Sequence, residues 1–433
     1  MKIEWGGFLL FLGWGILLFA MLNVEIKKDQ TCSYTKRALL AMNITGEPLN
    51  ALYTLLPIIL YKHLNATPLE VSLFITLRPL FAFFSFYWSS HLLYYKNKLV
   101  SNLIGAWTLS RLPFILLFFF PTFWALFFAA AVYQLFSKAG LPAWIEILNR
   151  NIPKEPREHL FTVYSAIAFL EGVALSFVIG RMLDANSEQW GAIFCVGALL
   201  GLCSLFFIRK ISIPLDTTAS MPLPNNRILF PWKEGFRLMR ARPDFARFQW
   251  GFMAGGGALM LMAPALNMFY VKQLSVSYSA MTFARFACMG IGVALSSLIW
   301  KKGLKRFPLH LLVGIVLVGF CLFPLALLAA QEYKPFLYIA FFIYGIAQAG
   351  SQILWNLSGT LFAEEGNSAP FTNVNILMLG IRGCILPLLG GVLCELTGPV
   401  PVLVLGAGIM AFGLFYMVRN RRPRKNEERQ MTP

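Results

Sequence analysis

The sequence is divided into apolar blocks of about 20 residues, the length of helix that crosses the hydrocarbon core of a bilayer. Twelve such blocks follow one another between residues 37 and 418. Hydrophobic residues make up 58% of the 433-residue chain and charged residues only 13%, whereas roughly 25% of the residues in an ordinary soluble protein are charged. The sequence therefore predicts an all-α polytopic membrane protein.

The predicted spans are joined by short polar loops. They cover residues 37–61, 69–93, 99–120, 122–147, 161–183, 190–208, 245–271, 278–300, 309–331, 336–361, 371–395 and 400–418. A further apolar segment from Trp5 to Leu22 fits an extra span, an uncleaved signal-like segment, or translated sequence upstream of a start at Met21. A cleaved signal peptide fits poorly because no A-x-A site follows. We favour an extra N-terminal span.

The basic residues are distributed unevenly between the two sides of the predicted bundle. With the N-terminal side of the first of the twelve spans taken as cytoplasmic, 27 Lys and Arg lie in cytoplasmic segments and four in the opposite loops. This is the bias of the positive-inside rule. Both ends of the twelve-span unit are therefore predicted to be cytoplasmic, in a multi-pass protein of the cell (inner) membrane. The net charge of +17 follows from this bias, and we expect no nucleic-acid partner.

Residues that could carry catalysis or hold a metal do not cluster in the sequence. The seven cysteines show no C-x-x-C spacing, and no second histidine or cysteine lies three or four residues from any of the four histidines. No G-x-x-x-x-G-K-[ST], G-x-S-x-G or H-E-x-x-H motif is present. We therefore expect a protein that is not an enzyme and has neither a metal site nor a cofactor.

The two halves of the chain repeat each other at an offset of about 207 to 211 residues. Arg78 and Arg285 are each followed by two serines, at +11 and +12. Further matching landmarks are Tyr133 and Trp144 with Tyr344 and Trp355, and Glu171, Gly172 and Gly180 with Arg382, Gly383 and Gly390. Six spans have therefore been duplicated in parallel, an arrangement known in secondary transporters.

The sequence resembles the major facilitator superfamily over roughly residues 37–420. The stretch PKEPRE (153–158) is similar to the family's P-x-x-x-R passage, and IGRMLDANSEQWGAIF (179–194) is similar to its passage into the sixth span. The family motif after the second span is reduced to Lys96 and Lys98, without its Gly and Asp. The resemblance implies two pseudo-symmetric halves of six helices. Spans one, four, seven and ten, with two, five, eight and eleven, would enclose a cavity that opens alternately to each side.

The predicted domains follow this division. They are an N-terminal segment (1–36) with an apolar helix at 5–22, a first six-helix half (37–210), a cytoplasmic linker (211–244), a second six-helix half (245–420) and a basic cytoplasmic tail (421–433). Within the linker, Trp232, Phe236 and Met239 recur at i, i+4 and i+7 with basic residues beside them. This pattern predicts an interfacial amphipathic helix, and we favour a lipid anchor over a partner-binding role.

Polar residues form stripes on the spans that the resemblance places around the cavity. In span one, Asn43, Glu47 and Asn50 fall on one helix face, and Pro48 loosens the backbone beside Glu47. The predicted substrate-binding residues are Asn43, Glu47, Asn50, Arg78, Gln134, Lys138, Arg285, Gln348, Gln352, Asn375 and Arg382. For the uncharged members, hydrogen bonds between helices explain the pattern equally well.

The charged residues within spans carry most of the functional argument, because burying a charge at mid-membrane costs about 2.5 to 3.5 kcal/mol or more. Arg78, Arg111, Lys138, Arg285 and Arg382 outnumber Glu47 and Glu171. An anionic solute would offset this excess, and the guanidinium fork suits carboxylate or phosphate. Arg382 then either pairs with Glu171 or anchors the substrate. The resemblance implies that span three, which carries Arg111, faces lipid more than the cavity, so Arg111 is not expected to contact the substrate.

We therefore expect a bilayer-embedded secondary active transporter of a small solute that works by alternating access. Glu47 is the first candidate for proton coupling, since desolvation raises the proton affinity of a carboxylate, and Glu171 is the second. The substrate is expected to be an organic anion, with H+ as the coupling ion. An efflux carrier for multiple amphipathic drugs, suggested by the 40 Phe, is the alternative within this class. A non-transporting integral membrane protein is the remaining one.

Overall fold

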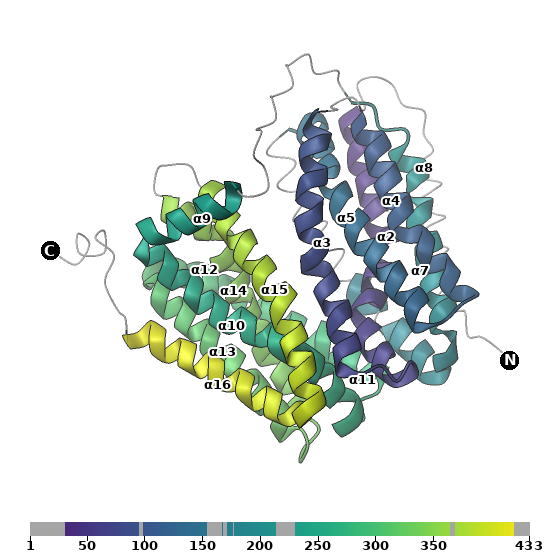
Figure 1. Ribbon diagram of the computed structural model, residues 1–433. Helices are drawn as coiled ribbons and strands as arrows, with labels where there is room; N and C mark the ends of the chain where they lie inside the picture. Colours follow the sequence, from purple (N-terminus) through teal and green to yellow (C-terminus); the bar gives the residue numbers. More distant parts are fainter. Residues whose placement is uncertain are drawn as a thin grey trace. The chain divides into compact units, whose positions relative to one another are not determined.

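The computed structural model describes residues 31–94, 98–153, 167, 171–175, 177–213, 230–363 and 369–419. These residues are nearly all helical, and none of them lies in a strand (Figure 1). The predicted all-α class is therefore confirmed. The predicted helix at 5–22, most of the irregular part of the linker and the basic tail at 421–433 lie outside the described residues.

The chain divides into two compact units. Unit 1 comprises residues 1–225 and 270–286, and unit 2 comprises residues 226–269 and 287–433. The second half of the chain thus contributes the segment 270–286 to unit 1. This division groups residues by contact, whereas the predicted domains group them by sequence repeat, so the predicted domain bounds remain a prediction.

Unit 1 is built from long helices that pack side by side. They are α2 (Thr31–His63), α3 (Pro68–Tyr94), α4 (Leu99–Ile115) with its 3-10 extension η3 (Leu116–Phe118), α5 (Phe123–Asn151), helical residues 171–175 and 177–185, α7 (Trp190–Cys203) and α8 (Leu205–Ile208). Helix α5 packs against α3 and α4, while α7 packs against α2 and α4. Apolar side chains of α2, α4, α5 and α8 meet in a common core, as expected for helices that are apolar all round.

Unit 2 has the same helical character. It contains α9 (Phe230–Ala241), α10 (Pro243–Met268), α12 (Met289–Arg306), α13 (Leu309–Ala329), α14 (Phe336–Ala363), α15 (Ala369–Thr397) and α16 (Pro399–Arg419). The chain passes between the units through two π-helical turns, η5 (Phe269–Gln273) and η6 (Phe283–Cys288), with the short helix α11 (Tyr278–Thr282) between them. Turns of this kind interrupt the regular i to i−4 hydrogen bonds of an α-helix.

Nine helices among the described residues are long and apolar enough to cross a membrane. They are 99–118, 123–148, 187–208, 243–273, 278–304, 309–329, 336–355, 374–397 and 399–419. The prediction of a polytopic membrane protein is confirmed. The count of twelve spans stays a prediction, because α2, α3 and the helical residues 171–185 are not among the nine.

The segment 270–286 is held on unit 1 by Asp184. The Asp184 carboxylate accepts hydrogen bonds from the backbone N–H groups of Tyr278 (2.8 Å) and Ser279 (2.9 Å), and also from the Ser279 hydroxyl. These N–H groups belong to the first turn of α11, where no helical carbonyl can pair with them. One carboxylate therefore satisfies two backbone donors and joins the segment to the helical residues 171–185.

Two glycines at matching positions of the sequence repeat lie at close helix crossings. A Cβ atom on Gly180 would lie 2.9 Å from Thr282 Oγ1 and 3.1 Å from Ser279 Cα. A Cβ atom on Gly390, in α15, would overlap the Leu261 carbonyl oxygen of α10. Both units thus use a glycine where two helix backbones approach too closely for any other residue.

Candidate functional site

A hydrogen-bonded chain of polar side chains joins α2 to α5 within unit 1. The Tyr133 hydroxyl donates to Asn50 Oδ1, and Asn50 Nδ2 donates to Glu47 Oε2 over 3.4 Å. Glu47 and Asn50 are neighbours because they lie one turn apart on α2, and Asn43 lies one turn before Glu47. The structure therefore brings Glu47 and Asn50 together. It also adds Tyr133, which was not among the predicted binding residues and whose only signal in the sequence is its place in the repeat.

The next residue on α5 extends this contact. Gln134 is 4% exposed, and its side chain hydrogen-bonds to Tyr53 of α2. The Tyr53 and Tyr133 rings lie 5.1 Å apart. Tyr133 and Gln134, neighbours on α5, thus both form hydrogen bonds with side chains of α2.

Three of the predicted cationic residues also belong to unit 1. Arg78, on α3, is exposed and lies near Lys138, on α5, so that the two positive charges repel each other; Arg78 also lies near Tyr53 and Tyr133. Arg285 Nη1 donates to the Thr54 carbonyl oxygen of α2 over 3.0 Å. Positive charge from three segments of the chain is therefore found near Tyr53 and Thr54, one turn beyond Asn50 on α2.

Glu171 brings a second carboxylate to this region. A Cβ atom on the adjacent Gly172 would lie 3.4 Å from Glu47 Oε1, and the negative charges of Glu47 and Glu171 repel each other. The Glu171 side chain is buried, with 8% of the residue exposed, and neither of its carboxylate oxygens has a hydrogen-bond partner among the described residues. Two carboxylates thus share a poorly solvated region of unit 1.

Arg382 is anchored within unit 2. Its Nη1 donates to the Phe252 carbonyl oxygen over 2.7 Å, and its guanidinium lies 5.4 Å from the centre of the Trp355 ring. A Cβ atom on Gly256 would overlap the guanidinium, so α10 carries a glycine where Arg382 of α15 packs against it. The pairing of Arg382 with Glu171, a residue of the other unit, stays a prediction.

The remaining predicted residues of unit 2 do not form one cluster with Arg382 in the described contacts. Asn375 is 3% exposed, accepts a hydrogen bond from Gln249 and donates to Ser358 over 2.6 Å. Its amide therefore joins α10, α14 and α15. This is the hydrogen bonding between helices that we considered as the alternative to substrate binding. Gln348 and Gln352 lie one turn apart on α14, the first partly buried and the second exposed.

Arg111 is a structural cation of unit 1 and does not lie on a lipid-facing surface. It is 2% exposed, its guanidinium lies 3.5 Å from the centre of the Trp107 ring, and Nη1 donates to the Ser110 hydroxyl over 3.0 Å. A Cβ atom on Gly201, in α7, would overlap Arg111 Nε. Gly201 thus leaves room for a guanidinium between α4 and α7, so Arg111 is buried between these helices, and its expected absence from the substrate site stays a prediction.

We expect Gly201→Ala to lower the free energy of unfolding by about 1 to 3 kcal/mol, the usual cost of adding a methyl group to a filled interior. The measurement is the melting temperature of the purified protein in one detergent. Gly105→Ala is the matched control: Gly105 lies in α4, and a Cβ atom added to it would have no neighbouring atom within 4 Å, so alanine should leave the melting temperature unchanged or raise it. Equal melting temperatures for both variants would show that Arg111 moves aside at no cost.

Chemistry based on a metal is not supported by the described residues, in which no three His, Cys, Asp or Glu side chains gather closely enough to hold an ion. The arrangement instead suits binding and proton exchange, with hydrogen-bonding side chains, two carboxylates and several cations on packed helices. None of these groups is a nucleophile oriented by a neighbouring base.

The fold is similar to those of solved membrane transporters. A mutant of the nucleoside transporter NupG aligns with a TM-score of 0.72 at 16% identity, covering 89% of this chain and 100% of that chain. A POT family transporter in complex with 5-aminolevulinic acid aligns with a TM-score of 0.66 at 11% identity, covering 89% and 95%. A bacterial homologue of the human lysosomal transporter Spinster aligns with a TM-score of 0.60 at 14% identity, covering 92% and 100%. No curated protein matches the sequence.

The family assignment comes from the sequence itself. The family model of the Major Facilitator Superfamily matches residues 5–381, which is most of the chain. This superfamily consists of transporters and not of enzymes. Together with the nine apolar helices and the shared fold, the match makes this protein an integral membrane protein. The chain is a member of the major facilitator superfamily.

Proposed function

We propose that the protein is a secondary active transporter that couples the movement of a small organic anion to the movement of protons. The observation that carries this proposal is the neighbourhood of Glu47 and Glu171 in unit 1, the unit that also holds the cations Arg78, Lys138 and Arg285. The carboxylates supply groups that can bind and release a proton. The cations supply groups that can bind an anion.

Proton coupling is supported by the surroundings of the two carboxylates. Glu47 has one neutral hydrogen-bond donor, the Asn50 amide, and no ion pair is formed by Glu47 or Glu171 within the described part of unit 1. Keeping two unpaired negative charges close together in a poorly solvated region is costly. A proton bound by Glu47 or Glu171 removes one of the two negative charges and so lowers the free energy of the pair. A charged group bound nearby can change how readily this proton leaves.

Preference for an anion is supported by the three cations along α2. Arg285 donates to a backbone carbonyl with one of its guanidinium nitrogens, and the fork of an arginine can bind two oxygens of a carboxylate or phosphate at once. Lys138 and Arg78 repel each other, so an anion bound beside them would lower the free energy of the site. Of the solved transporters named above, one is a nucleoside transporter and one binds 5-aminolevulinic acid, and at 16% and 11% identity they do not indicate which substrate this chain carries.

A thermal-shift screen of the purified protein tests this function directly. Organic carboxylates and phosphate monoesters should raise the melting temperature, with the increase growing with ligand concentration, because a ligand that binds only the folded state stabilises it. Neutral solutes and lipophilic cations serve as comparison sets. A response to lipophilic cations alone would favour the efflux carrier for amphipathic compounds, and no response to any solute class would favour a non-transporting protein.

The proposed topology places both ends of the twelve-span unit and the linker in the cytoplasm. In a cysteine-free variant, a membrane-impermeant thiol reagent added to intact cells should label Lys334→Cys and should not label Asn225→Cys. Both positions should react after the membrane is opened with detergent, which controls for accessibility. Labelling of Asn225→Cys in sealed cells would reverse the orientation that the charge bias predicts.

A further inference from the structure

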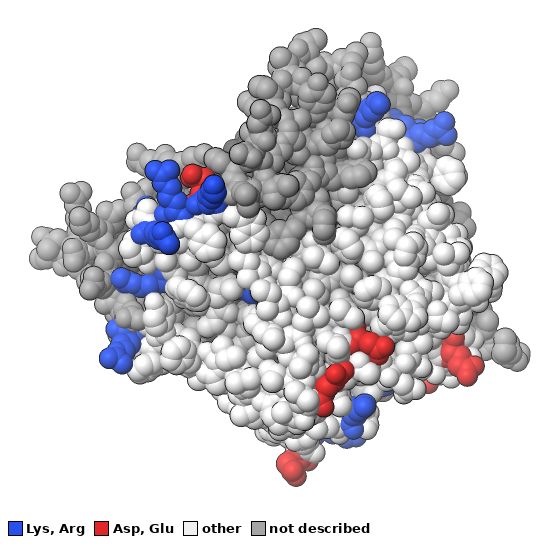
Figure 2. Space-filling model, in the orientation of Figure 1, with Lys and Arg blue, Asp and Glu red and all other residues white. Residues whose placement is uncertain are grey.

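Helix α9 carries a basic stripe, formed by Lys233, Arg237 and Arg240, that plays no part in the proposed transport site. The three residues fall at i, i+4 and i+7 and are exposed, and basic side chains gather over α9 in Figure 2. Arg237 lies 3.8 Å from Glu234, with 82% and 51% of the two side chains exposed. An ion pair so open to solvent holds its members loosely, so the whole stripe is available to a ligand.

The opposite side of α9 is seated on α15. Gly235 is buried, and a Cβ atom on it would lie 3.2 Å from Leu377 Cδ1 and 3.4 Å from Val374 Cγ2. Val374 and Leu377 form the first turn of the apolar segment 374–397, one of the nine candidate membrane helices. Helix α9 also leads directly into the candidate span 243–273. The helix therefore lies where two membrane-spanning helices begin, at the depth of lipid headgroups.

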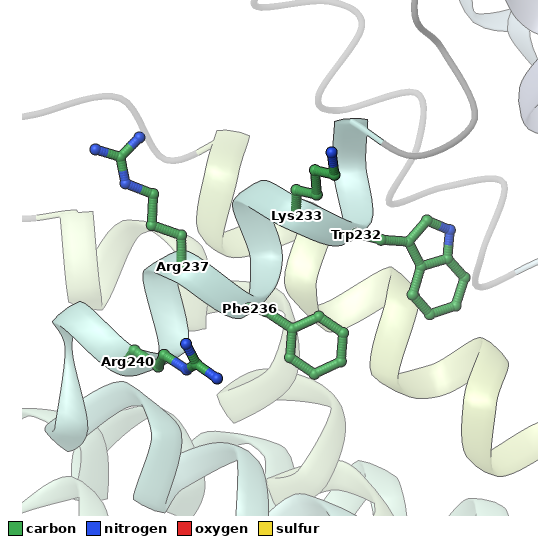
Figure 3. Close-up of a pocket in the computed structure, with 5 residues that line it drawn as sticks. All are labelled: Trp232, Lys233, Phe236, Arg237 and Arg240. Atoms are coloured by element: carbon green, nitrogen blue, oxygen red, sulfur yellow. The ribbon is translucent and has the colours of Figure 1, made fainter.

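An open cavity of about 480 Å³ lies along α9 between its apolar and basic sides, lined by Trp232, Lys233, Phe236, Arg237 and Arg240. Figure 3 shows Lys233 and Arg237 pointing away from the helices below, Trp232 and Phe236 pointing to one side, and Arg240 extending toward the Phe236 side. Phe236 is 56% exposed although it is a large apolar residue. Aromatic residues beside cations are typical of helices that lie at the membrane interface.

We propose that α9 binds anionic phospholipid headgroups, with the basic stripe on the phosphates and with Phe236 and Trp232 against the glycerol and the upper acyl chains. The three cations are spread over about two turns of the helix and do not converge on one point, which suits a layer of headgroups better than a single small phosphate. In the proposed topology this leaflet is the cytoplasmic one, whose surface is negatively charged. The role is independent of the transported substrate.

The experiment compares charge-matched variants of the full-length protein in detergent. Phosphatidylglycerol is titrated into the wild type, Arg237→Gln/Arg240→Gln and Lys272→Gln/Lys334→Gln, and bound lipid is counted by native mass spectrometry. Each cation near an anionic lipid surface is worth about fivefold in affinity, so the α9 variant should bind about 25-fold more weakly. The control removes two exposed lysines that the charge bias places on the opposite side of the membrane and should bind nearly as the wild type does. Phosphatidylcholine should bind all three alike.

Three outcomes would overturn the proposal. They are a wild type that binds phosphatidylglycerol no better than phosphatidylcholine, an equal loss in the two variants, and displacement of the lipid by millimolar inorganic phosphate, which would indicate a site for a free anion. Should the α9 variant be poorly folded, the wild type still decides the matter: its affinity for phosphatidylglycerol must fall as salt is raised, because exposed charges are screened. An affinity that does not depend on salt would contradict the charge contacts.

Discussion

Glu47→Gln should abolish pH-driven accumulation of the transported solute while leaving exchange of solute across the membrane intact. If one proton moves with each solute molecule, a gradient of one pH unit can concentrate the solute about tenfold. Glutamine keeps the hydrogen bond from Asn50 and the size of the side chain, but it cannot release a proton. The accumulation ratio should therefore fall to about one. The transported solute is the anion that raises the melting temperature of the purified protein most. Its uptake into proteoliposomes is measured with and without an imposed pH gradient.

Glu332→Gln is the matched control for this experiment. Glu332 is exposed and lies beyond the end of α13, so removing its carboxylate changes the net charge equally and should leave accumulation unchanged. Accumulation by Glu47→Gln at the level of the wild type would move the coupling role to Glu171 or to another ion. A loss of both accumulation and exchange would instead mean that Glu47 is needed to bind the solute or to fold unit 1.

Arg382→Gln should weaken binding of the stabilising anion by about 10- to 150-fold, the value of a charge-assisted hydrogen bond. Nη1 binds the Phe252 carbonyl oxygen, while Nε is buried without a hydrogen-bond partner among the described residues, so the guanidinium has a donor that its present surroundings leave unpaired. The measurements are the ligand dissociation constant and the melting temperature. Arg306→Gln, which removes an exposed cation at the end of α12, should change neither.

The double variant Glu171→Gln/Arg382→Gln separates binding from architecture. If the two charges pair, losing either one should lower stability by about 3 to 5 kcal/mol and losing both should restore it. We expect the double variant to fold but not to bind the anion. Recovery of both stability and transport would reduce Arg382 to a structural role and would leave Arg78, Arg285 and Lys138 as the anion-binding groups.

Helix positions were predictable because bilayer thickness imposes a length on every apolar block. The span expected at 245–271 became α10 at Pro243–Met268, and the helix expected around Trp232 to Met239 became α9 at Phe230–Ala241. Both are determined by local hydrophobicity and periodicity. Exact ends depend on hydrogen bonding at the termini, such as the π-helical turn that follows α10, and such bonding leaves little trace in composition.

The partners of the polar residues were less predictable, because they depend on which helices become neighbours. The stripe of Glu47 and Asn50 on α2 was visible in the sequence, but only packing against α5 adds the Tyr133 hydroxyl. The surroundings of Arg111 could not be predicted, since the space that accepts it comes from Gly201, in the distant helix α7. Many spans contain glycines, so the sequence does not indicate which glycine of which span will lie against a given arginine.

The grouping of segment 270–286 with unit 1 has a consequence for expressing the two halves of the chain as separate fragments. A fragment that ends in the linker carries the first copy of the duplicated unit, yet it lacks the residues that bind Asp184 and cover Gly180. We expect such a fragment to be less stable than the same residues in the whole protein, and expect a second fragment produced with it to supply the missing contacts. The contacts of the first copy thus extend into the sequence of the second copy, so each copy depends on the other for part of its packing.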